Sequence, residues 1–320
     1  MSSERRAVID VGTGSVKLLI ADVTGSSVTP IQEESEQTRL GSGFYETHRL
    51  QPEAIQRTAT AVGRFARSAT ASGVSWIRLI ATSAARDALN QADLVAALRS
   101  ASGLEPEVIS GEQEADWVFA GVTSDMLISG RRLLIIDIGG GSTEFILGHQ
   151  GTHSFRHSFQ LGAMRLLAQG RLSDPPTGEE WRACQHWLQE FLAGKVKPLL
   201  DPALEAERPS SPLLVCTGGT GTIVAGMHNR SPTFDRDQIE ATRLSREDVE
   251  AQRVVVWGKS LADRKRIIGL PPNRADVIVG GLAILAEVMA GFGYSEVRVS
   301  TRGLRFAALM DRSSSQVARI

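Results

Sequence analysis

Two stretches of the chain carry the same unusual arrangement of one acidic residue beside a glycine-rich turn. The first reads AVIDVGTGSVKLLIADV (residues 7–23), and the second reads LIIDIGGGSTEFILGHQ (residues 134–150). They align without a gap, so that Asp10 matches Asp137 at an offset of 127 residues. Because this spacing is far longer than the unit of a solenoid, the repeat predicts two domains of similar fold.

Each copy predicts a strand, a tight turn and a second strand. In the second copy, the apolar run Leu133–Ile136 indicates a buried strand, and the alternation after Ser142 indicates the next one. Glycine lets backbone N–H groups approach an anion and permits a positive φ, and hydroxyl groups add further donors. A turn without a ligand is the alternative for one copy, but two copies in the same register favour phosphate binding. The predicted phosphate-binding residues of the turns are Gly12, Thr13, Gly14, Ser15, Gly139, Gly140, Gly141, Ser142 and Thr143.

The acid in each turn implies a cation. Asp10 and Asp137 end their strands beside the glycines and would repel a bare phosphate group. A divalent cation between the acid and the phosphate removes this repulsion, and Mg²⁺ prefers such oxygen ligands. The sequence therefore predicts that Mg²⁺ or Mn²⁺ is required.

The composition is that of an ordinary globular enzyme with balanced charge. Lys and Arg number 35 against 36 Asp and Glu, so nothing indicates binding to duplex nucleic acid or to an anionic membrane. The sequence shows neither a signal-type segment nor a run of about 18 apolar residues, which makes the cytoplasm the expected location. The two cysteines indicate neither a disulfide framework nor a metal cluster, and the six histidines show no metal-ligand pattern.

The rest of the chain reads as alternating helices and strands, which favours mixed sheets covered by helices. After the first two strands, the order is helix, strand, helix, strand, helix. A third glycine turn, TGGTGT (residues 217–222), again joins a strand to a helix. The segment Asp201–Pro212 reads as an exposed connection because it is rich in Pro, Ser and acidic residues.

Several independent motifs, in a fixed order, then point to a known family. They are IDVGTGSVKLLIADV, RLGSG, ATSAARDA, ISGEQEADW, IDIGGGSTE, SFQLGAMRL, TGGTGT, LPPNRADVIVGG and VSTRGLR. Through them the chain resembles the exopolyphosphatase and guanosine pentaphosphate phosphatase family in its short two-domain form. This family is a branch of the superfold that actin, sugar kinases and heat-shock ATPases share.

The resemblance implies an α/β protein of two ribonuclease H-like (actin-like ATPase) domains, with mixed sheets flanked by helices around an interdomain cleft. The first domain would comprise residues 1–122 with 303–320, and the second would comprise residues 123–302. The two glycine turns would face each other across the cleft. A homodimer is also expected.

The resemblance also assigns the metal ligands. Asp10 and Asp137 would hold or orient Mg²⁺, and Glu144 matches a family acid near the metal. Because Lys17 occupies the position of Glu144 in the first copy, strand alternation leaves an outward-facing Glu144 as the alternative.

A general base is implied in the motif SGEQEAD. The matching position is Glu114, which would activate the attacking water. Glu112 is the rival, on a different side of the same helix. Spacing alone favours a third interpretation, in which both residues are helix-start acids stabilised by the helix dipole.

Two arginines are predicted to neutralise phosphate oxygens, because a guanidinium group can bind two oxygens at once. They are Arg86 in ATSAARDA and Arg274 in PNRADV. The alternative for each is a surface ion pair, with Asp87 and Asp276 as close neighbours in sequence.

The family implies a hydrolase that releases terminal orthophosphate from polyphosphate or from guanosine pentaphosphate. A non-hydrolytic nucleotide or alarmone-binding protein of the same fold is the alternative, and a phosphotransferase is a third option. Four departures from the family pattern concern substrate affinity and choice more than the reaction: Gly14, Ala163, Cys216 and Phe306.

Overall fold

The chain forms two compact units. The computed structural model describes residues 3–170, 172–206, 211–311 and 318–319. The first unit comprises residues 1–124 with 303–320, and the second comprises residues 125–302. The domains predicted from the sequence, residues 1–122 with 303–320 and residues 123–302, stay a prediction. Residues 1–2, 312–317 and 320 of the predicted first domain lie outside the described residues.

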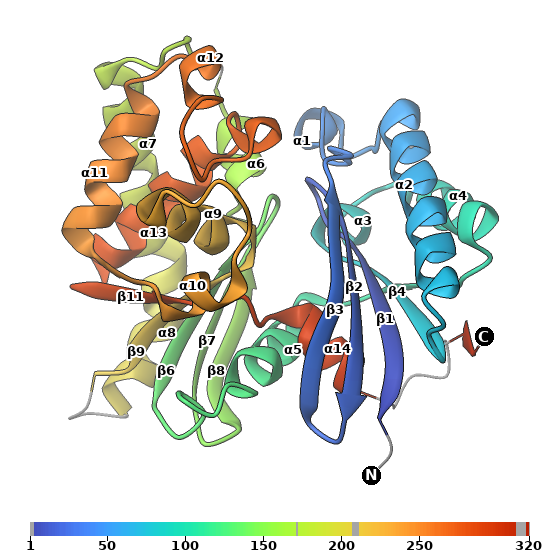
Figure 1. Cartoon of the computed structure of the whole chain (residues 1–320). Helices are drawn as coiled ribbons and strands as arrows, with labels where there is room; N and C mark the ends of the chain where they lie inside the picture. The colour runs from blue at the N-terminus through green and yellow to red at the C-terminus, as the bar shows by residue number, and fades with distance from the viewer. Residues whose placement is uncertain (1–2, 171, 207–210, 312–317, 320) are drawn as a thin grey trace. The chain divides into compact units, whose positions relative to one another are not determined.

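The first unit is built on a six-stranded sheet in the order β12-β4-β1-β2-β3, with β5 paired to β4 (Figure 1). Strands β1, β2 and β3 are antiparallel, whereas β4 runs parallel to both β1 and β5. The elements are β1 (Glu4–Val11), β2 (Val16–Thr24), β3 (Ser27–Glu36), α1 (Phe44–Thr47), α2 (Pro52–Ala71), β4 (Trp76–Ala81), α3 (Ser83–Arg86), α4 (Gln91–Ser102), β5 (Pro106–Val108), α5 (Gly111–Thr123), α14 (Leu304–Met310) and β12 (Ala318–Arg319).

The second unit is built on a six-stranded sheet in the order β10-β11-β9-β6-β7-β8. Its elements are β6 (Leu133–Ile138), β7 (Thr143–His149), β8 (Thr152–Phe159), α6 (Ala163–Leu167), α7 (Gly178–Phe191), the π-helix η1 (Leu192–Val196), α8 (Lys197–Ala206), β9 (Leu213–Thr217), α9 (Gly218–Asn229), α10 (Arg236–Ala241), β10 (Arg243–Ser245), α11 (Arg246–Trp257), α12 (Leu261–Arg264), the 3-10 helix η2 (Pro272–Arg274), α13 (Ile278–Gly291) and β11 (Glu296–Val299).

The two units share one strand order. Reading each sheet from its antiparallel edge gives β3-β2-β1-β4-β5 in the first unit and β8-β7-β6-β9-β11 in the second. Helices flank both sheets, as Figure 1 shows for α2 and α4 in the first unit and for α11 and α13 in the second. The predicted fold class, mixed sheets flanked by helices, is therefore confirmed.

The repeat seen in the sequence is also a repeat in hydrogen bonding. The amide of Gly12 donates to the carbonyl of Ser15 at 3.0 Å, and the amide of Gly139 donates to that of Ser142 at the same distance. Strand β1 pairs with β2 as β6 pairs with β7, with the acid of each turn at the same position in the ladder. The two strand-turn-strand units therefore have one local geometry.

Strand alternation separates each acid from the main apolar core of its unit. In β6, Leu134, Ile136 and Ile138 belong to the large buried cluster, so Asp137 lies on the opposite face of the sheet. In β1, the buried cluster of the first unit contains Ala7, Ile9 and Val11, so Asp10 likewise lies on the opposite face of its sheet. Burial of each such aliphatic side chain stabilises the fold by about 1.5–3 kcal/mol, which holds these strands and hence both turns in place.

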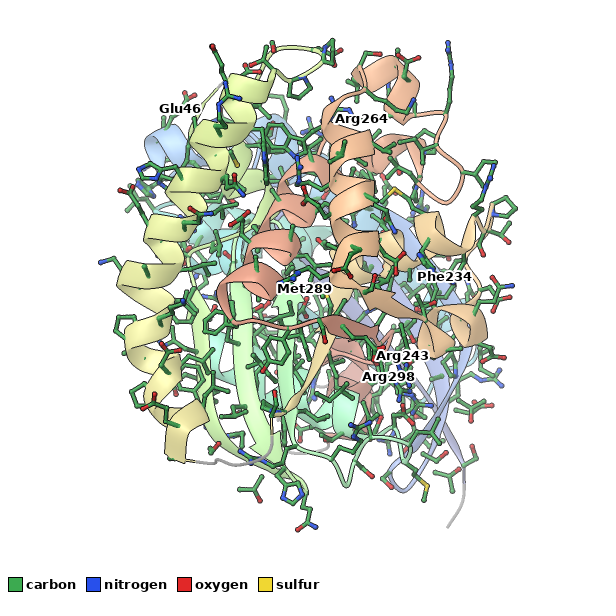
Figure 2. The ribbon with its side chains drawn as sticks, turned by 90° about the vertical axis from the view of Figure 1, so that its left-hand side faces the viewer. Glu46, Phe234, Arg243, Arg264, Met289 and Arg298 are labelled. Atoms are coloured by element: carbon green, nitrogen blue, oxygen red, sulfur yellow. The ribbon has the colours of Figure 1, made fainter. Side chains whose placement is uncertain are left out.

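The edge of the second sheet sets two like charges against each other. Arg243 on β10 and Arg298 on β11 are direct cross-strand neighbours (Figure 2). Burial, and then the charge of Arg298, lower the pKa of Arg243. Asp125 forms an ion pair of 2.7 Å with the buried Arg298 and so limits the repulsion that such a pair otherwise causes.

Two parts of the secondary structure differ from the expectation. Strand β3 was not anticipated, because Val28 is its one fully buried residue and its ladder has an irregularity beside Pro30, as edge strands often do. Helix α8 continues through Asp201 to Ala206, where an exposed connection was expected; residues 207–210 of that segment lie outside the described residues. Within the described part of the chain, none of the helices has both the length and the apolar character to cross a bilayer.

Candidate functional site

The second glycine turn is held by the start of α6. The carbonyl oxygens of Gly139 and Gly140 accept hydrogen bonds from the amides of Ala163 and Met164 at 2.9 and 2.8 Å. Arg165 donates through Nε to the carbonyl of Gly141 at 2.7 Å. A Cβ on the preceding residue, Gly162, would lie 2.5 Å from the carbonyl carbon of Gly140, so the close approach requires glycine there. The motif SFQLGAMRL therefore fixes the conformation of this turn.

The first glycine turn is held by the motif RLGSG. The amide of Arg39 donates to the carbonyl of Gly14 at 2.9 Å, and the amide of Gly41 donates to that of Thr13 at 2.8 Å. A Cβ on Gly41 would overlap the Thr13 methyl group, so this contact also requires glycine. Each turn is thus fixed by a separate glycine-containing segment.

The glycines of the two turns do not adopt the positive φ that the sequence analysis gave as one reason for them. None of their glycines is among the positive-φ residues of the described chain, so a left-handed backbone is not the reason for them. The amides of Gly12 and Gly139 donate the hydrogen bonds that close the two turns. Anion binding by the turns therefore depends on the amides of the residues that follow these two.

One predicted phosphate-binding hydroxyl has an internal partner instead. Thr143 is fully buried, and its Oγ1 donates to the carbonyl of Leu161. The hydroxyl hydrogen is thereby engaged, so the side chain of Thr143 connects β7 to the segment before α6. The predicted phosphate contact at this position concerns its backbone alone. The hydroxyl-bearing residues Thr13, Ser15 and Ser142 are also buried.

Two carboxylates lie opposite each other beside the second turn. Asp137 on β6 and Glu144 on β7 are direct cross-strand partners and therefore share one face of the sheet. Glu144 is only 1% exposed, and it accepts a hydrogen bond of 2.7 Å from the hydroxyl of Ser158 on β8. Glu144 is thus buried in the sheet, not facing outward to solvent. Like charges directly opposite each other destabilise a sheet, and a divalent cation between them removes that cost.

The first turn has a different charge balance. The cross-strand partner of Asp10 is Lys17, where the second turn has Glu144. Burial raises the pKa of the Asp10 carboxyl, and the charges of Lys17 and Arg305 oppose this shift. Asp10 thus faces a lysine across the strand pair, whereas Asp137 faces a second acid.

The donor set fits Mg²⁺ better than a metal that demands a full protein cage. Among the described residues, His, Cys, Asp and Glu form no group of three or more that could enclose an ion. Mg²⁺ usually binds through one or two carboxylates and takes its other ligands from water and substrate phosphates. Asp137 and Glu144 meet that requirement.

The candidate base and one candidate arginine are paired with each other in the first unit. Arg86 Nη1 lies 3.0 Å from Glu114 Oε2 and donates to the carbonyl of Ile109 at 3.1 Å. Asp87, the alternative partner, is farther from Arg86, at 3.8 Å. Glu114 is buried in the first turn of α5, whereas Glu112 is exposed. The two acids of the motif therefore have different environments. Stabilisation by the helix dipole alone would not require such a difference between them.

Strand order brings this pair to the same sheet edge as the first turn. The amide of Thr82, just before α3, donates to the carbonyl of Val11 at 3.1 Å. The amide of Ile109, just before α5, donates to that of Ala81 at 3.1 Å. The carboxyl ends of the parallel strands β1, β4 and β5 thus present the first turn, Arg86 and Glu114 together.

Arg274 belongs to the second unit, where it ends η2 just before α13 and is half-buried. Ser158 was not predicted as part of any site. Only the pairing of β7 with β8 places it opposite Glu144, so no local sequence signal identifies it. The site residues thus divide into Asp10, the first turn, Arg86 and Glu114 in the first unit, and Asp137, Glu144, the second turn and Arg274 in the second.

The departures from the family pattern leave these arrangements intact. Ala163 contributes its backbone amide to the second turn, which any side chain but proline would allow. Cys216 is fully buried in β9, and burial together with the charge of Asp137 raises the pKa of its thiol. Phe306 is buried in α14.

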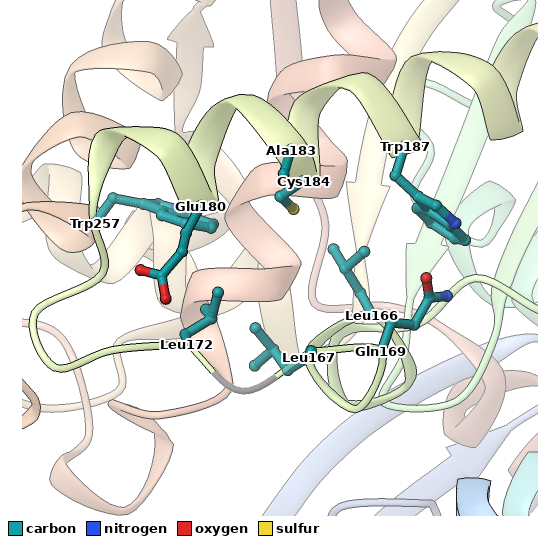
Figure 3. A pocket seen from close by; sticks show the side chains of 10 residues that line it. Leu166, Leu167, Gln169, Leu172, Glu180, Ala183, Cys184, Trp187 and Trp257 are labelled. Carbon is teal, nitrogen blue, oxygen red and sulfur yellow. The ribbon is translucent and has the colours of Figure 1, made fainter.

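A cavity of about 240 Å³ lies beside α6, α7 and α11 and is lined by residues other than the predicted site residues (Figure 3). Its lining is mainly apolar and includes Leu166, Leu172, Trp187 and Trp257. Burial raises the pKa of Cys184 in its wall to about 12, so this thiol is not a thiolate near neutral pH. None of the predicted site residues lines the cavity, and its apolar wall does not suit a phosphate group.

Comparison with known proteins agrees with the resemblance drawn from the motifs. A family model described as the Ppx/GppA phosphatase family matches residues 19–315. Exopolyphosphatase 2 of Mycobacterium tuberculosis is 33% identical over 302 residues, which cover 90% of this chain and 91% of that protein.

Solved structures agree over nearly the whole chain. An exopolyphosphatase from Cytophaga hutchinsonii is similar with a TM-score of 0.85 at 26% identity, covering 96% of each chain. The Ppx/GppA family member of Aquifex aeolicus is similar with a TM-score of 0.77 at 26% identity, covering 97% of each chain. The extent of the family match and of these similarities leads to one conclusion: this chain belongs to the Ppx/GppA phosphatase family.

Proposed function

We propose that the chain is a Mg²⁺-dependent phosphoanhydride hydrolase that releases terminal orthophosphate from polyphosphate or from guanosine pentaphosphate. The observation that carries the proposal is the pair Asp137 and Glu144, two acids opposite each other beside a glycine turn. Such a pair calls for a divalent cation, and a cation beside a phosphate-binding turn is the arrangement of phosphoryl-transfer sites. The similar proteins named exopolyphosphatases support the substrate class.

The residues of the site have complementary roles in this proposal. The backbones of the two turns bind phosphate oxygens, and Arg86 and Arg274 neutralise further charge. Asp137 and Glu144 hold the cation in the second unit, and Asp10 is the proposed metal ligand of the first unit. When bound, Mg²⁺ neutralises the charge that develops on the phosphate oxygens.

Glu114 acts as the general base. A carboxylate orients a water molecule for in-line attack and accepts its proton as the bond to phosphorus forms. Arg86, at 3.0 Å, restricts the orientation of Glu114. A protein that only binds nucleotides needs no buried carboxylate at this position.

Phosphate release from two substrates tests the proposal. Long-chain polyphosphate and guanosine pentaphosphate would be compared side by side, each with Mg²⁺, with Mn²⁺ and with excess chelator. We expect release from at least one substrate with either metal and none with chelator. Binding of guanosine pentaphosphate without release would instead identify the non-hydrolytic alternative, and full release in chelator would refute the role of the metal.

A cytoplasmic location and a homodimer are also part of the proposal. Both cysteines are unpaired, as is usual for proteins of a reducing compartment. Cell fractionation tests the location, and size-exclusion chromatography with light scattering tests the dimer, whose expected mass is about twice the 34.5 kDa of one chain.

A further inference from the structure

The third glycine turn, TGGTGT, comprises the last residue of β9 and the first five residues of α9, and it has no role in the proposed reaction so far. Its first glycine, Gly218, has a φ of +79°, a backbone conformation that favours glycine. A Cβ on Gly218 would overlap Oδ1 of Asp137 and lie 3.1 Å from Cγ. The carboxylate of Asp137 therefore lies directly against the bare Cα of Gly218.

The turn cannot easily move away from this contact. Thr217 is the parallel cross-strand partner of Asp137, so the ladder between β6 and β9 sets the distance between the two segments. Thr220 donates through Oγ1 to the carbonyl of Ile138 at 3.1 Å, which ties the turn to the residue after Asp137. Gly281 on α13 lies against that threonine, since a Cβ there would be 2.5 Å from Oγ1. Helix α13 thus packs directly against the turn.

We propose that Gly218 is a positioning residue, which sets the place and orientation of the Asp137 carboxylate for binding the divalent cation. Its part in cation binding rests on the proposed function, whereas the contact itself does not. Glu144, the other acid, is held in a similar way by the hydroxyl of Ser158. Each of the two acids therefore has one neighbour that orients it without binding the metal.

The effect on cation binding follows from the coordination chemistry of Mg²⁺. This ion requires nearly ideal octahedral geometry, so a small displacement of one carboxylate weakens it. Changes to groups that orient a metal ligand usually reduce affinity by about 10- to 100-fold. We expect a loss of this size when Gly218→Ala pushes the carboxylate of Asp137 aside.

Gly151 provides a matched control for backbone strain. It lies in the turn between β7 and β8, also with a φ of +79°, but a Cβ there would meet no atom within 4 Å. Gly218→Ala and Gly151→Ala therefore both place an alanine at the same positive φ, and only the first displaces Asp137. Mn²⁺ binding, measured by titration calorimetry, should weaken about 10- to 100-fold in Gly218→Ala and stay unchanged in Gly151→Ala.

A second measurement tests the contact without any metal. Gly218→Ala should lower Tm more than Gly151→Ala does. In an Asp137→Ala background the overlap disappears, so the two glycine changes should lower Tm by the same amount. If Gly218→Ala alone fails to fold, recovery of folding in the double variant with Asp137→Ala supports the contact, and failure of that variant too overturns it.

The outcomes separate this inference from the proposed function. A wild-type chain that binds Mn²⁺, with Gly218→Ala binding it equally well, overturns the positioning role and leaves the hydrolase intact. A wild-type chain that neither binds Mn²⁺ nor releases phosphate overturns the proposed function and with it the role of Gly218 in cation binding. In that case the Tm comparison still decides whether the contact with Asp137 exists.

Discussion

At the scale of single residues, environment distinguishes acids that look alike in the sequence. Glu112 and Glu114 belong to one motif, but Glu112 is exposed, whereas Glu114 is buried and forms an ion pair with Arg86. Lys17 and Glu144 occupy the same position of the repeat, and they give the two turns opposite charge partners. A role can therefore be assigned to one member of each pair from its contacts.

Glu114→Gln should lower kcat by about 10²- to 10⁴-fold, the usual effect of losing a general base. Glutamine keeps the size and much of the hydrogen bonding, so KM should change little. Steady-state phosphate release measures both parameters, and a fall in kcat at normal KM marks an interaction made in the transition state.

Glu112→Gln is the control, because it removes the same charge from the same helix turn. We expect it to keep its activity. If Glu112→Gln loses turnover and Glu114→Gln retains it, the base is the other acid; if both retain it, another group activates the water.

Glu144→Gln should weaken Mn²⁺ binding by about tenfold or more, since it removes one of the two charges that face the cation. The Tm increase that Mg²⁺ causes should shrink accordingly. Ser158→Ala keeps both charges and loses only the orienting hydrogen bond, so its effect should be smaller. An unchanged affinity in Glu144→Gln would show that the cation binds elsewhere.

At the scale of elements, the motifs act in pairs in which a glycine of one packs closely against a residue of the other. Helix α13 shows this most clearly, because Gly281 lies against Thr220 and a Cβ on Gly280 would be 2.5 Å from the carbonyl of Ala163. Ala163 in turn donates to Gly139. One helix therefore supports both the second and the third glycine turns, which explains why a glycine pair occurs in LPPNRADVIVGG.

The capping box of α7 predicts a pH dependence of stability. The hydroxyl of Ser173, and then the backbone amides of Thr177 and Ser173, lower the pKa of Glu180 from 4.5 to about 2. Because the folded pKa is the lower one, the charged contact stabilises fully above about pH 4.5 and is lost as the pH falls towards 2. Wild type should exceed Glu180→Gln in Tm at pH 6, and the difference should shrink steadily as the pH falls from about 4.5 through 2. A difference in Tm that does not change with pH contradicts this prediction.

At the scale of the whole molecule, the chain leaves the first unit after residue 124 and returns to it at Gly303. Helix α14 packs on α5 and β1, and a Cβ on Gly121 would overlap the carbonyl of Gly303. Two buried arginines hold the end of α14: Arg6 donates to the carbonyl of Leu309 at 2.6 Å, and Arg78 donates to that of Ala308 at 2.9 Å. The first unit is therefore completed by the last part of the chain.

Arg78→Met should destabilise the protein by about 3–5 kcal/mol, as the loss of one partner from a buried ion pair does. The change leaves the carboxylate of Glu107 and the carbonyl of Ala308 without this partner. The free energy of unfolding in urea measures the loss. Arg5→Met is the control, because Arg5 forms a partly exposed ion pair with Asp22 and should matter far less. Equal losses in the two variants would contradict the role given to Arg78.

The sequence by itself determined the parts of this protein that depend on neighbouring residues. The strand-turn-strand units around Asp10 and Asp137 are correctly predicted. The apolar periodicity of these strands reflects burial of one or both faces of the sheet. A tight turn also brings the two strands that it joins into antiparallel pairing. Strand β3 escaped prediction because a polar edge strand has no such pattern. The extension of α8 escaped it because its proline and acids are typical of loops.

Only the tertiary structure decided which side chains meet. Arg86 reaches Glu114, Ser158 reaches Glu144, and Gly218 lies against Asp137, although 81 residues separate the last two. These contacts depend on the order and register of the strands, above all on the parallel pairing of β6 with β9, which long crossovers connect. A parallel pair carries no local turn that sets its register, so the packing of the helices on the sheet decides which residues come together.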